Sequence, residues 1–307
     1  MSRAGFLEFV KDNRPVLSDG AMGTMLMRKG MAHGECPELW NETRPGPVGD
    51  VAAEYFKAGS DMVETNTFGS SPIKLSEFGL SEKAFELSRK GALIAREAAE
   101  KISGRQVFVA GSIGPLGKLL EPYGELSPDD AMENFRVQIE GLAAGGVDAL
   151  CIETMISLEE SLCALRAAKK SAPGLPVIST FTFGREGKGG FRTMMGEDVA
   201  SIAESVFNEG GDIVGANCGH GIDTMVSVCA EFNEIVDKGK DKFIMVQANA
   251  GLPVVENGAS VYKETPEVMS SKIGSLIESG ADIIGGCCGT CPSHINAFSK
   301  IIRPMRS

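Results

Sequence analysis

The sequence predicts an α/β fold, a single (β/α)8 (TIM) barrel over residues 1–307, and three observations lead to this prediction. Eight short apolar segments rich in β-branched residues recur along the chain. Longer segments with apolar residues at helical spacing separate them. Small residues, mostly glycines, close four of the expected helices just before the next apolar segment. Eight strand–helix repeats with short helix-to-strand turns are typical of a right-handed parallel barrel.

The expected strands are apolar throughout, as parallel strands covered on both faces should be. They comprise residues 15–19, 61–66, 107–111, 149–153, 177–181, 213–218, 243–247 and 283–287. The segments between these strands are expected to be helices, and the segment from Pro128 to Gly146 is an example. Ser127 suits its N-cap and Pro128 its first turn, and Ala131 and Phe135 begin its apolar stripe. Helix ends are expected at residues 58–59, 145–146, 210–211 and 279–280.

An open, doubly wound sheet is the alternative fold. It is disfavoured because no glycine-rich phosphate loop follows the first expected strand. Three strand-to-helix connections are long, namely residues 20–48, 113–127 and 184–196. Long connections on one face and short turns on the other predict that the functional face lies at the carboxyl ends of the strands.

The composition excludes several classes of protein. A net charge of -11 argues against binding to a nucleic-acid backbone, which needs a basic surface. The sequence has no apolar run of about 18 residues and no signal-peptide pattern, so we expect no membrane span and a cytoplasmic location. The eight cysteines then indicate metal binding or catalysis in a reducing compartment, not a disulfide framework.

Polar and sulfur-containing residues gather at the carboxyl ends of the expected strands, which meet at one mouth in a barrel. Residues of this kind lie at or just past the ends of seven of the eight expected strands: Asp19, Glu64, Ser112, Glu153, Cys218, Asn249, Cys287 and Cys288. Polar residues scattered at random would not select this end of so many strands. We therefore expect them to form one site.

Three of these residues suggest a metal centre. Thiolates of Cys218, Cys287 and Cys288, from two strands, would make an open zinc site with one vacant position. The alternative is three buried structural thiols, since free cysteine is commonly buried. Cys291, His220 and His294 lie nearby in the sequence, and we expect them to stand outside the ligand set, because a closed site would exclude a substrate.

Six motifs, in order and spread over nearly the whole chain, resemble the homocysteine S-methyltransferase family. They are Asp-Gly-Ala-Met-Gly-Thr at 19–24, Glu-Thr-Asn-Thr-Phe-Gly at 64–69, Gly-Ser-Ile-Gly-Pro at 111–115, Ile-Glu-Thr at 152–154, Gly-Ala-Asn-Cys at 215–218 and Gly-Gly-Cys-Cys-Gly-Thr at 285–290. The resemblance implies a (β/α)8 barrel that holds Zn2+ through Cys218, Cys287 and Cys288, which are then also the catalytic residues. It implies a methyl transfer to homocysteine or another small thiol.

Segments 118–122 and 248–254 are most similar to the branch formed by the homocysteine-binding module of cobalamin-dependent methionine synthase. This resemblance implies that Asn249 occupies the fourth zinc position until the substrate thiol displaces it. It also assigns Asp19 and Glu153 to the homocysteine amine. Without it, Asp19 could equally form a turn or helix cap, and Glu153 could form an ion pair at the barrel mouth.

The remaining expected substrate contacts surround these two acids. Backbone N–H groups around Gly20 and Ala21 and at Ser112 suit the homocysteine carboxylate. Asn217, which precedes a zinc ligand, is also counted among the substrate contacts. Glu64 either contacts substrate or orders its loop.

The methyl donor is open at this stage. The chain lacks the Asp-x-His-x-x-Gly corrinoid-ligand motif, so we expect methylcobalamin to be presented by a separate corrinoid protein, or the chain to be an excised module. Alternatives are a homocysteine methyltransferase that uses S-methylmethionine or betaine, a corrinoid methyltransferase with another small-molecule substrate, and a non-catalytic zinc-binding subunit.

Overall fold

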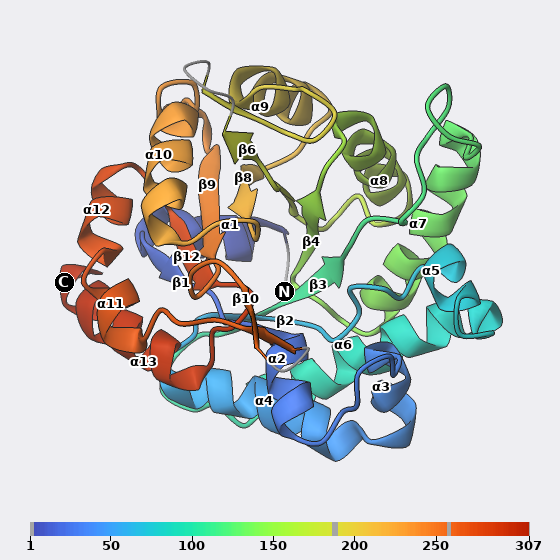
Figure 1. Cartoon of the computed structure of the whole chain (residues 1–307), viewed down its shortest axis with the longest axis horizontal. Coiled ribbons are helices and arrows are strands. Elements are labelled where there is room, and N and C mark those ends of the chain that lie inside the picture. Colours follow the sequence, from blue (N-terminus) through green and yellow to red (C-terminus); the bar gives the residue numbers. More distant parts are fainter. Residues whose placement is uncertain (1–2, 186–189, 257–258, 307) are drawn as a thin grey trace.

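Eight parallel strands form a barrel in the computed structural model, which describes residues 3–185, 190–256 and 259–306. Their order is β1-β12-β9-β8-β5-β4-β3-β2, so strands that follow one another along the chain are neighbours. The ring closes between its first two strands, where Asp61 N donates to Leu17 O at 2.7 Å. Helices surround the strands (Figure 1). The predicted (β/α)8 barrel is therefore confirmed, and the open sheet is excluded.

Each barrel strand overlaps the segment in which it was expected. The strands are β1 Val16–Leu17, β2 Met62–Glu64, β3 Phe108–Ile113, β4 Ala149–Met155, β5 Val177–Phe181, β8 Ile213–Asn217, β9 Phe243–Ala248 and β12 Ile283–Gly286. Every pair of hydrogen-bonded neighbours is parallel. Parallel pairing directs all eight carboxyl ends to one mouth.

The helices begin and end where local chemistry dictates. Ser127 caps α7 by accepting from Asp130 N, and Pro128 follows in the first turn. Gly59, Gly210 and Gly280 follow three helices with φ of 121°, 92° and 105°, which only glycine adopts at low cost. The helices are α1 Arg3–Asp12, α2 Met22–Arg28, α3 Trp40–Thr43, α4 Pro45–Ala58, α5 Pro72–Ser76, α6 Ala84–Glu100, α7 Pro128–Ala144, α8 Leu158–Ser171, α9 Val199–Asn208, α10 Ile222–Asn233, α11 Pro266–Ser270, α12 Ile273–Glu278 and α13 Pro292–Ile302, with short 3-10 turns at Pro37–Leu39, Ser81–Lys83, Lys238–Lys240 and Arg303–Arg306.

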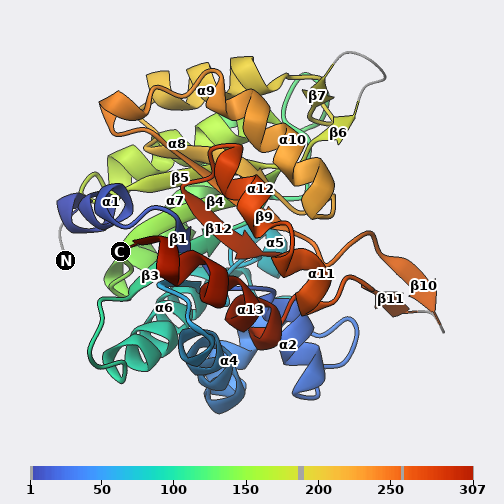
Figure 2. The ribbon, with the colours of Figure 1, turned by 90° about the vertical axis from the view of Figure 1, so that its left-hand side faces the viewer.

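Alternate residues of each strand point into the barrel, where they form a packed interior. Helix α1 lies at the amino-terminal end of the strands (Figure 2), and its Phe6 and Val10 are buried there. They join one cluster with inward-facing strand residues: Val16, Met62, Phe108, Ala110, Ala149, Cys151, Ile178, Ile213, Phe243, Met245 and Ile283. This end is filled, so a ligand can enter only from the opposite mouth.

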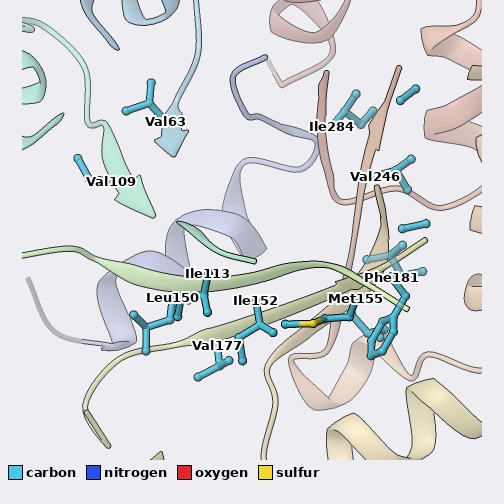
Figure 3. Close-up of a cluster of buried hydrophobic side chains, with 14 of the residues drawn as sticks. Val63, Val109, Ile113, Leu150, Ile152, Met155, Val177, Phe181, Val246 and Ile284 are labelled. Atoms are coloured by element: carbon cyan, nitrogen blue, oxygen red, sulfur yellow. The ribbon is translucent and has the colours of Figure 1, made fainter. Parts of the chain in front are cut away.

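The other residues of the strands point outward against the helices. Val63, Val109, Leu150 and Ile152 are labelled members of this outer core (Figure 3). Because successive residues alternate, the residue after an outward one faces the interior. Glu64 follows Val63 and Glu153 follows Ile152, so the pleat itself turns both carboxylates inward.

Two of the three long connections contain helices or strands, whereas the connection between β3 and α7 contains neither. Segment 20–48 contains α2 and α3, and segment 184–196 contains the antiparallel pair β6 Gly184–Arg185 and β7 Phe191–Arg192, between which residues 186–189 lie outside the described residues. A fourth long connection was not predicted. It follows β9 and carries a hairpin of β10 Val254–Glu256 and β11 Ala259–Val261, which projects from the barrel at the end opposite α1 (Figure 2).

No helix in the described part of the chain is both long and apolar enough to span a membrane.

Candidate functional site

Three cysteines meet at the carboxyl ends of two barrel strands. Cys218 follows β8, whereas Cys287 and Cys288 follow β12. Their sulfur atoms all lie within 4.8 Å of one another, and Cys218 Sγ is 3.8 Å from Cys288 Sγ. Within residues 3–185, 190–256 and 259–306, no other group of three His, Cys, Asp or Glu side chains is gathered this closely.

The loop backbone sets this arrangement. Cys218 has a φ of 59°, in the left-handed region that β-branched and most other residues avoid. Its N–H donates to Gln247 O at 3.1 Å, and Cys287 N donates to Ala248 O at 2.8 Å. Both cysteine loops are therefore fixed to the same strand, β9, which lies between β8 and β12.

The donor set fits a soft divalent metal such as zinc. Besides the three sulfurs, Asn249 Oδ1 is buried without a hydrogen-bond partner, and the Asn249 side chain also lies within hydrogen-bonding reach of Cys218. An unpaired buried oxygen is costly, and a metal ligand bond would satisfy it. Hydrogen bonds from Cys287 and Cys288 lower the pKa of Cys218, so the cluster already favours a thiolate.

The nearby Cys and His residues have other partners. Cys291 is the N-cap of α13, where its sulfur lies 3.3 Å from His294 Nδ1 and 3.1 Å from Ser293 Oγ. His294 Nε2 donates to Glu264 O, and His220 Nε2 donates to Phe183 O. All three side chains lie outside the sulfur cluster, as expected.

Two buried carboxylates, Glu64 from β2 and Glu153 from β4, line the same cavity as the cysteines. Glu153 accepts hydrogen bonds from Ser112 Oγ and from Asn217 Nδ2, the latter at 3.2 Å. Glu64 accepts from Gln247 Nε2 at 3.0 Å. The ion pair considered as an alternative for Glu153 does not occur among the described residues, because its two oxygens accept from Ser112 and Asn217 and not from a Lys or Arg.

Asp19 and Asn217 lie behind these acids and not in the cavity wall. Asp19 Oδ2 accepts from Glu64 N at 2.9 Å and its Oδ1 from Ser18 Oγ, so this carboxylate fixes the end of β2. Asn217 Oδ1 accepts from Thr154 N at 2.8 Å and from Thr180 Oγ1 at 2.9 Å. Every polar atom of the Asn217 side chain is thereby used within the protein.

The expected carboxylate subsite is only partly free. Ala21 N donates to Thr290 Oγ1 at 3.2 Å, and Ser112 N donates to Thr65 Oγ1 at 3.0 Å. Gly20 packs so closely that a Cβ there would lie 2.6 Å from Thr290 Oγ1. Gly20, Gly23 and neighbouring residues of the first turn of α2 nevertheless line the cavity.

Burial dominates the electrostatics of the acids. It raises the pKa of Asp19 to about 7, and burial together with the Asp19 charge raises the pKa of Glu64 to about 8. Burial, and next the charge of Glu64, also raise the pKa of Glu153 well above its ordinary value. These three buried acids have no Lys or Arg partner among the described residues, so a ligand that brings a cationic group would stabilise their ionised forms.

The cavity has a volume of about 930 Å3 and opens at the mouth of the barrel. Its floor carries the carboxylates and the cysteines, whereas Met27, Arg28, His33 and Phe68 line its outer part. A single amino acid would fill only a fraction of this space, since ligand pockets of 300–1,000 Å3 take molecules of drug size. The outer cavity therefore leaves room for a second reactant.

Sequence reasoning missed several cavity residues. Gln247 follows the outward-facing Val246, so strand alternation could have pointed to it. Thr154 has a φ of 60°, and Tyr262 and Val261 reach the cavity from the unpredicted hairpin connection. The sequence carries no signal that would have placed these last three.

Comparisons with known proteins agree with this geometry. The model of the homocysteine S-methyltransferase family matches residues 16–302. The chain belongs to this family. The predicted S-methyltransferase class is thus confirmed at the level of the family.

Similar proteins extend the comparison. The methionine synthases of Mycobacterium tuberculosis and Mycobacterium leprae are each 31% identical to this chain, over 97% and 94% of it, yet the chain spans only 26% and 24% of their lengths. The crystal structure of the homocysteine methyltransferase MmuM from Escherichia coli, in its metallated form, has a TM-score of 0.78 and 21% identity over 96% of this chain and 98% of that one. It shares the barrel fold.

Proposed function

We propose that this chain transfers a methyl group to the sulfur of homocysteine and so forms methionine. One observation supports this most directly: a thiol cluster suited to a metal and two buried carboxylates line a single cavity. The metal-binding cluster suits the thiol of an acceptor molecule, and the two carboxylates suit an ammonium group of the same molecule. Homocysteine carries both groups.

Cys218, Cys287 and Cys288 would hold Zn2+, with Asn249 Oδ1 at the fourth position when no acceptor is present. Zinc bound there would supply Lewis acidity that keeps the acceptor thiol, with a free pKa of about 8.5, ionised at neutral pH. Three thiolates leave the site electron-rich, which favours a nucleophilic sulfur. Cysteine ligation of this kind suits a reducing compartment, so we assign the chain to the cytoplasm.

The chain's own residues orient the acceptor. Glu153, held by Ser112 and Asn217, accepts from the ammonium group. Glu64, held by Gln247, adds a second negative charge when the approaching ammonium group displaces its proton. Asp19 contributes through Glu64, whose backbone it fixes. The carboxylate would lie against the first turn of α2, near Gly20 and Gly23. These contacts hold the sulfur at the cysteine cluster and leave its far side open toward the mouth.

A methylcorrinoid presented by a separate protein is the donor we favour. The outer cavity has room for a large reactant, and exposed apolar side chains lie on several strand-to-helix connections at this end of the barrel. They include Met27, Phe68, Leu119, Tyr123, Met194, Leu252, Val254 and Val255. An apolar rim of this kind is typical of surfaces that bind other molecules.

A donor panel tests the proposal. Zinc-loaded protein is incubated with homocysteine and either free methylcobalamin, S-methylmethionine or betaine, and methionine is quantified. We expect methionine from methylcobalamin; turnover only with another donor would replace the corrinoid but keep the acceptor. No methionine from any donor would favour the non-catalytic zinc-binding subunit. Parent protein should contain about one zinc per chain, and Cys287→Ala should lose it.

A further inference from the structure

The loops that follow the neighbouring strands β1 and β12 carry opposite ends of the proposed acceptor site. The β1 loop, residues 19–24, contains Asp19, which accepts from Glu64 N and so fixes one of the acids proposed to bind the ammonium group. The β12 loop, residues 286–290, contains two of the three cysteines proposed to hold the metal. The separation of these loops therefore sets the separation between the two ends of the site.

Two hydrogen bonds join the loops at the margins of their contact. Gly286 N donates to Asp19 O at 2.8 Å, and Gly289 N donates to Thr24 Oγ1 at 3.2 Å. The first bond extends the pairing of β1 with β12, and the second reaches the first turn of α2. The two loops are thus attached to each other on both sides of a central contact.

Thr290 makes this central contact. Its Oγ1 accepts from Ala21 N at 3.2 Å and donates to Cys287 O at 2.7 Å, so one hydroxyl group binds both loops. A Cβ on Gly20 would lie 2.6 Å from this oxygen, and a Cβ on Gly286 would also collide with it. The two backbones therefore approach the hydroxyl group as closely as glycine allows, which leaves the loops little freedom to shift.

Thr290 does not contact the cavity itself. The residue is fully buried and is absent from the cavity wall, whereas Ala21 and Thr24 line it. Ala21 is also held from its other side, since Tyr55 OH donates to Ala21 O at 3.0 Å. An effect of Thr290 on an acceptor must therefore act through the position of the β1 loop relative to the β12 loop.

We propose that Thr290 is a positioning residue that selects the length of the acceptor. Its hydroxyl group fixes the separation between the cysteines and the acids at a value that suits homocysteine, whereas cysteine is one methylene group shorter and cannot reach both. A site that binds both ends of a molecule discriminates in this way only if its ends are held within a fraction of an ångström. This inference rests on the proposed function and gives its acceptor preference a structural basis.

Thr290→Val tests this role, because it removes the hydroxyl group and keeps the shape of the side chain, and Thr290→Ser is the matched control that keeps the hydroxyl group. Calorimetry measures the binding of homocysteine, cysteine and 2-mercaptoethanol, which has no amino-acid end, to each zinc-loaded protein. In Thr290→Val the preference for homocysteine over cysteine should fall about three- to tenfold, as expected for one lost hydrogen bond. Binding of 2-mercaptoethanol should match the parent, and Thr290→Ser should keep the parent preference.

Three results would overturn the proposal: an unchanged preference in Thr290→Val, an equal loss of affinity for all three thiols, or a loss of preference in Thr290→Ser as large as that in Thr290→Val. An equal loss would show that Thr290 only supports the fold of the β12 loop.

Thr24→Val provides a second test, which does not depend on the folding or metal content of Thr290→Val. It removes the acceptor of Gly289 N from the same contact between the loops. The preference for homocysteine over cysteine should fall in this variant too, and a preference equal to that of the parent would contradict the coupling. A parent protein that binds zinc but prefers none of the three thiols would refute the proposed acceptor, and this inference with it.

Discussion

Glu153 illustrates how single residues define this site. Its two oxygens are held by Ser112 from β3 and Asn217 from β8, while burial and the charge of Glu64 raise its pKa well above the ordinary value. The carboxylate is thus fixed in position and unpaired, which is the state expected of a group that awaits a cationic ligand. Asp19 and Asn217, expected as substrate contacts, stay in this proposal as supports of Glu64 and Glu153.

Glu153→Gln should weaken homocysteine binding by about ten- to a hundredfold while zinc is retained. A charge-assisted hydrogen bond contributes about 1.5–3 kcal/mol, and the substitution removes the charge. Calorimetry of homocysteine binding, with zinc content measured in parallel, checks this. The control ligand is 4-mercaptobutanoate, which lacks the amino group and should bind both proteins equally. An equal loss for both ligands would place Glu153 in a purely structural role.

Glu64→Gln should change the pH dependence of stability of the metal-free protein. The folded state keeps a proton on Glu64 up to pH about 8, whereas the ordinary pKa is 4.5. Between these values the folded state binds more protons than the unfolded chain, so the free energy of unfolding falls as pH rises. The neutral glutamine removes this fall.

Thermal unfolding of both proteins between pH 5 and 8.5 measures the effect. We expect the midpoint of Glu64→Gln to exceed that of the parent by several degrees at pH 8 and to approach it near pH 5. The exposed Glu125 provides the control substitution Glu125→Gln, which should follow the parent curve. Curves for Glu64→Gln and the parent that stay parallel would show that Glu64 is ionised in the fold throughout.

Strand positions and helix ends were the predictable elements, because both depend on local sequence. Apolar segments predicted all eight barrel strands, and glycines after α4, α7, α9 and α12 marked the helix ends. The gathering of cysteines and acids at one mouth followed from topology alone. Contacts of loops with distant segments were not predictable: α1 inside the barrel end, the β10–β11 hairpin and the left-handed Thr154 depend on tertiary packing.

Gly59→Ala should destabilise the fold by about 1–3 kcal/mol. Its φ is 121°, and an added Cβ would lie 2.7 Å from Ser299 Cβ on α13. Gly274→Ala is the matched control, because this position lies inside α12 with no atom within 4 Å of the added Cβ. It should stabilise by about 0.5–1 kcal/mol. Chemical denaturation measures both; equal effects would contradict the account of the helix end.

At the scale of the whole molecule, the barrel separates stability from chemistry. One end is closed by α1, and the other carries the cavity, the cysteine cluster and the hairpin. The family assignment covers residues 16–302, whereas the domain span of 1–307 stays a prediction.

Counting protons on homocysteine binding tests the central claim, that a metal held by the cysteine cluster keeps the acceptor as a thiolate. Near pH 7 the free thiol is mostly protonated, since its pKa is about 8.5. Calorimetry in buffers of different ionisation enthalpy gives the number released. Glu64 and Asp19 can also lose protons when the ammonium group binds, but this contribution is common to zinc-loaded and zinc-free protein. The loaded protein should therefore release about one proton more than the zinc-free protein. Equal release by the two forms would contradict thiolate activation.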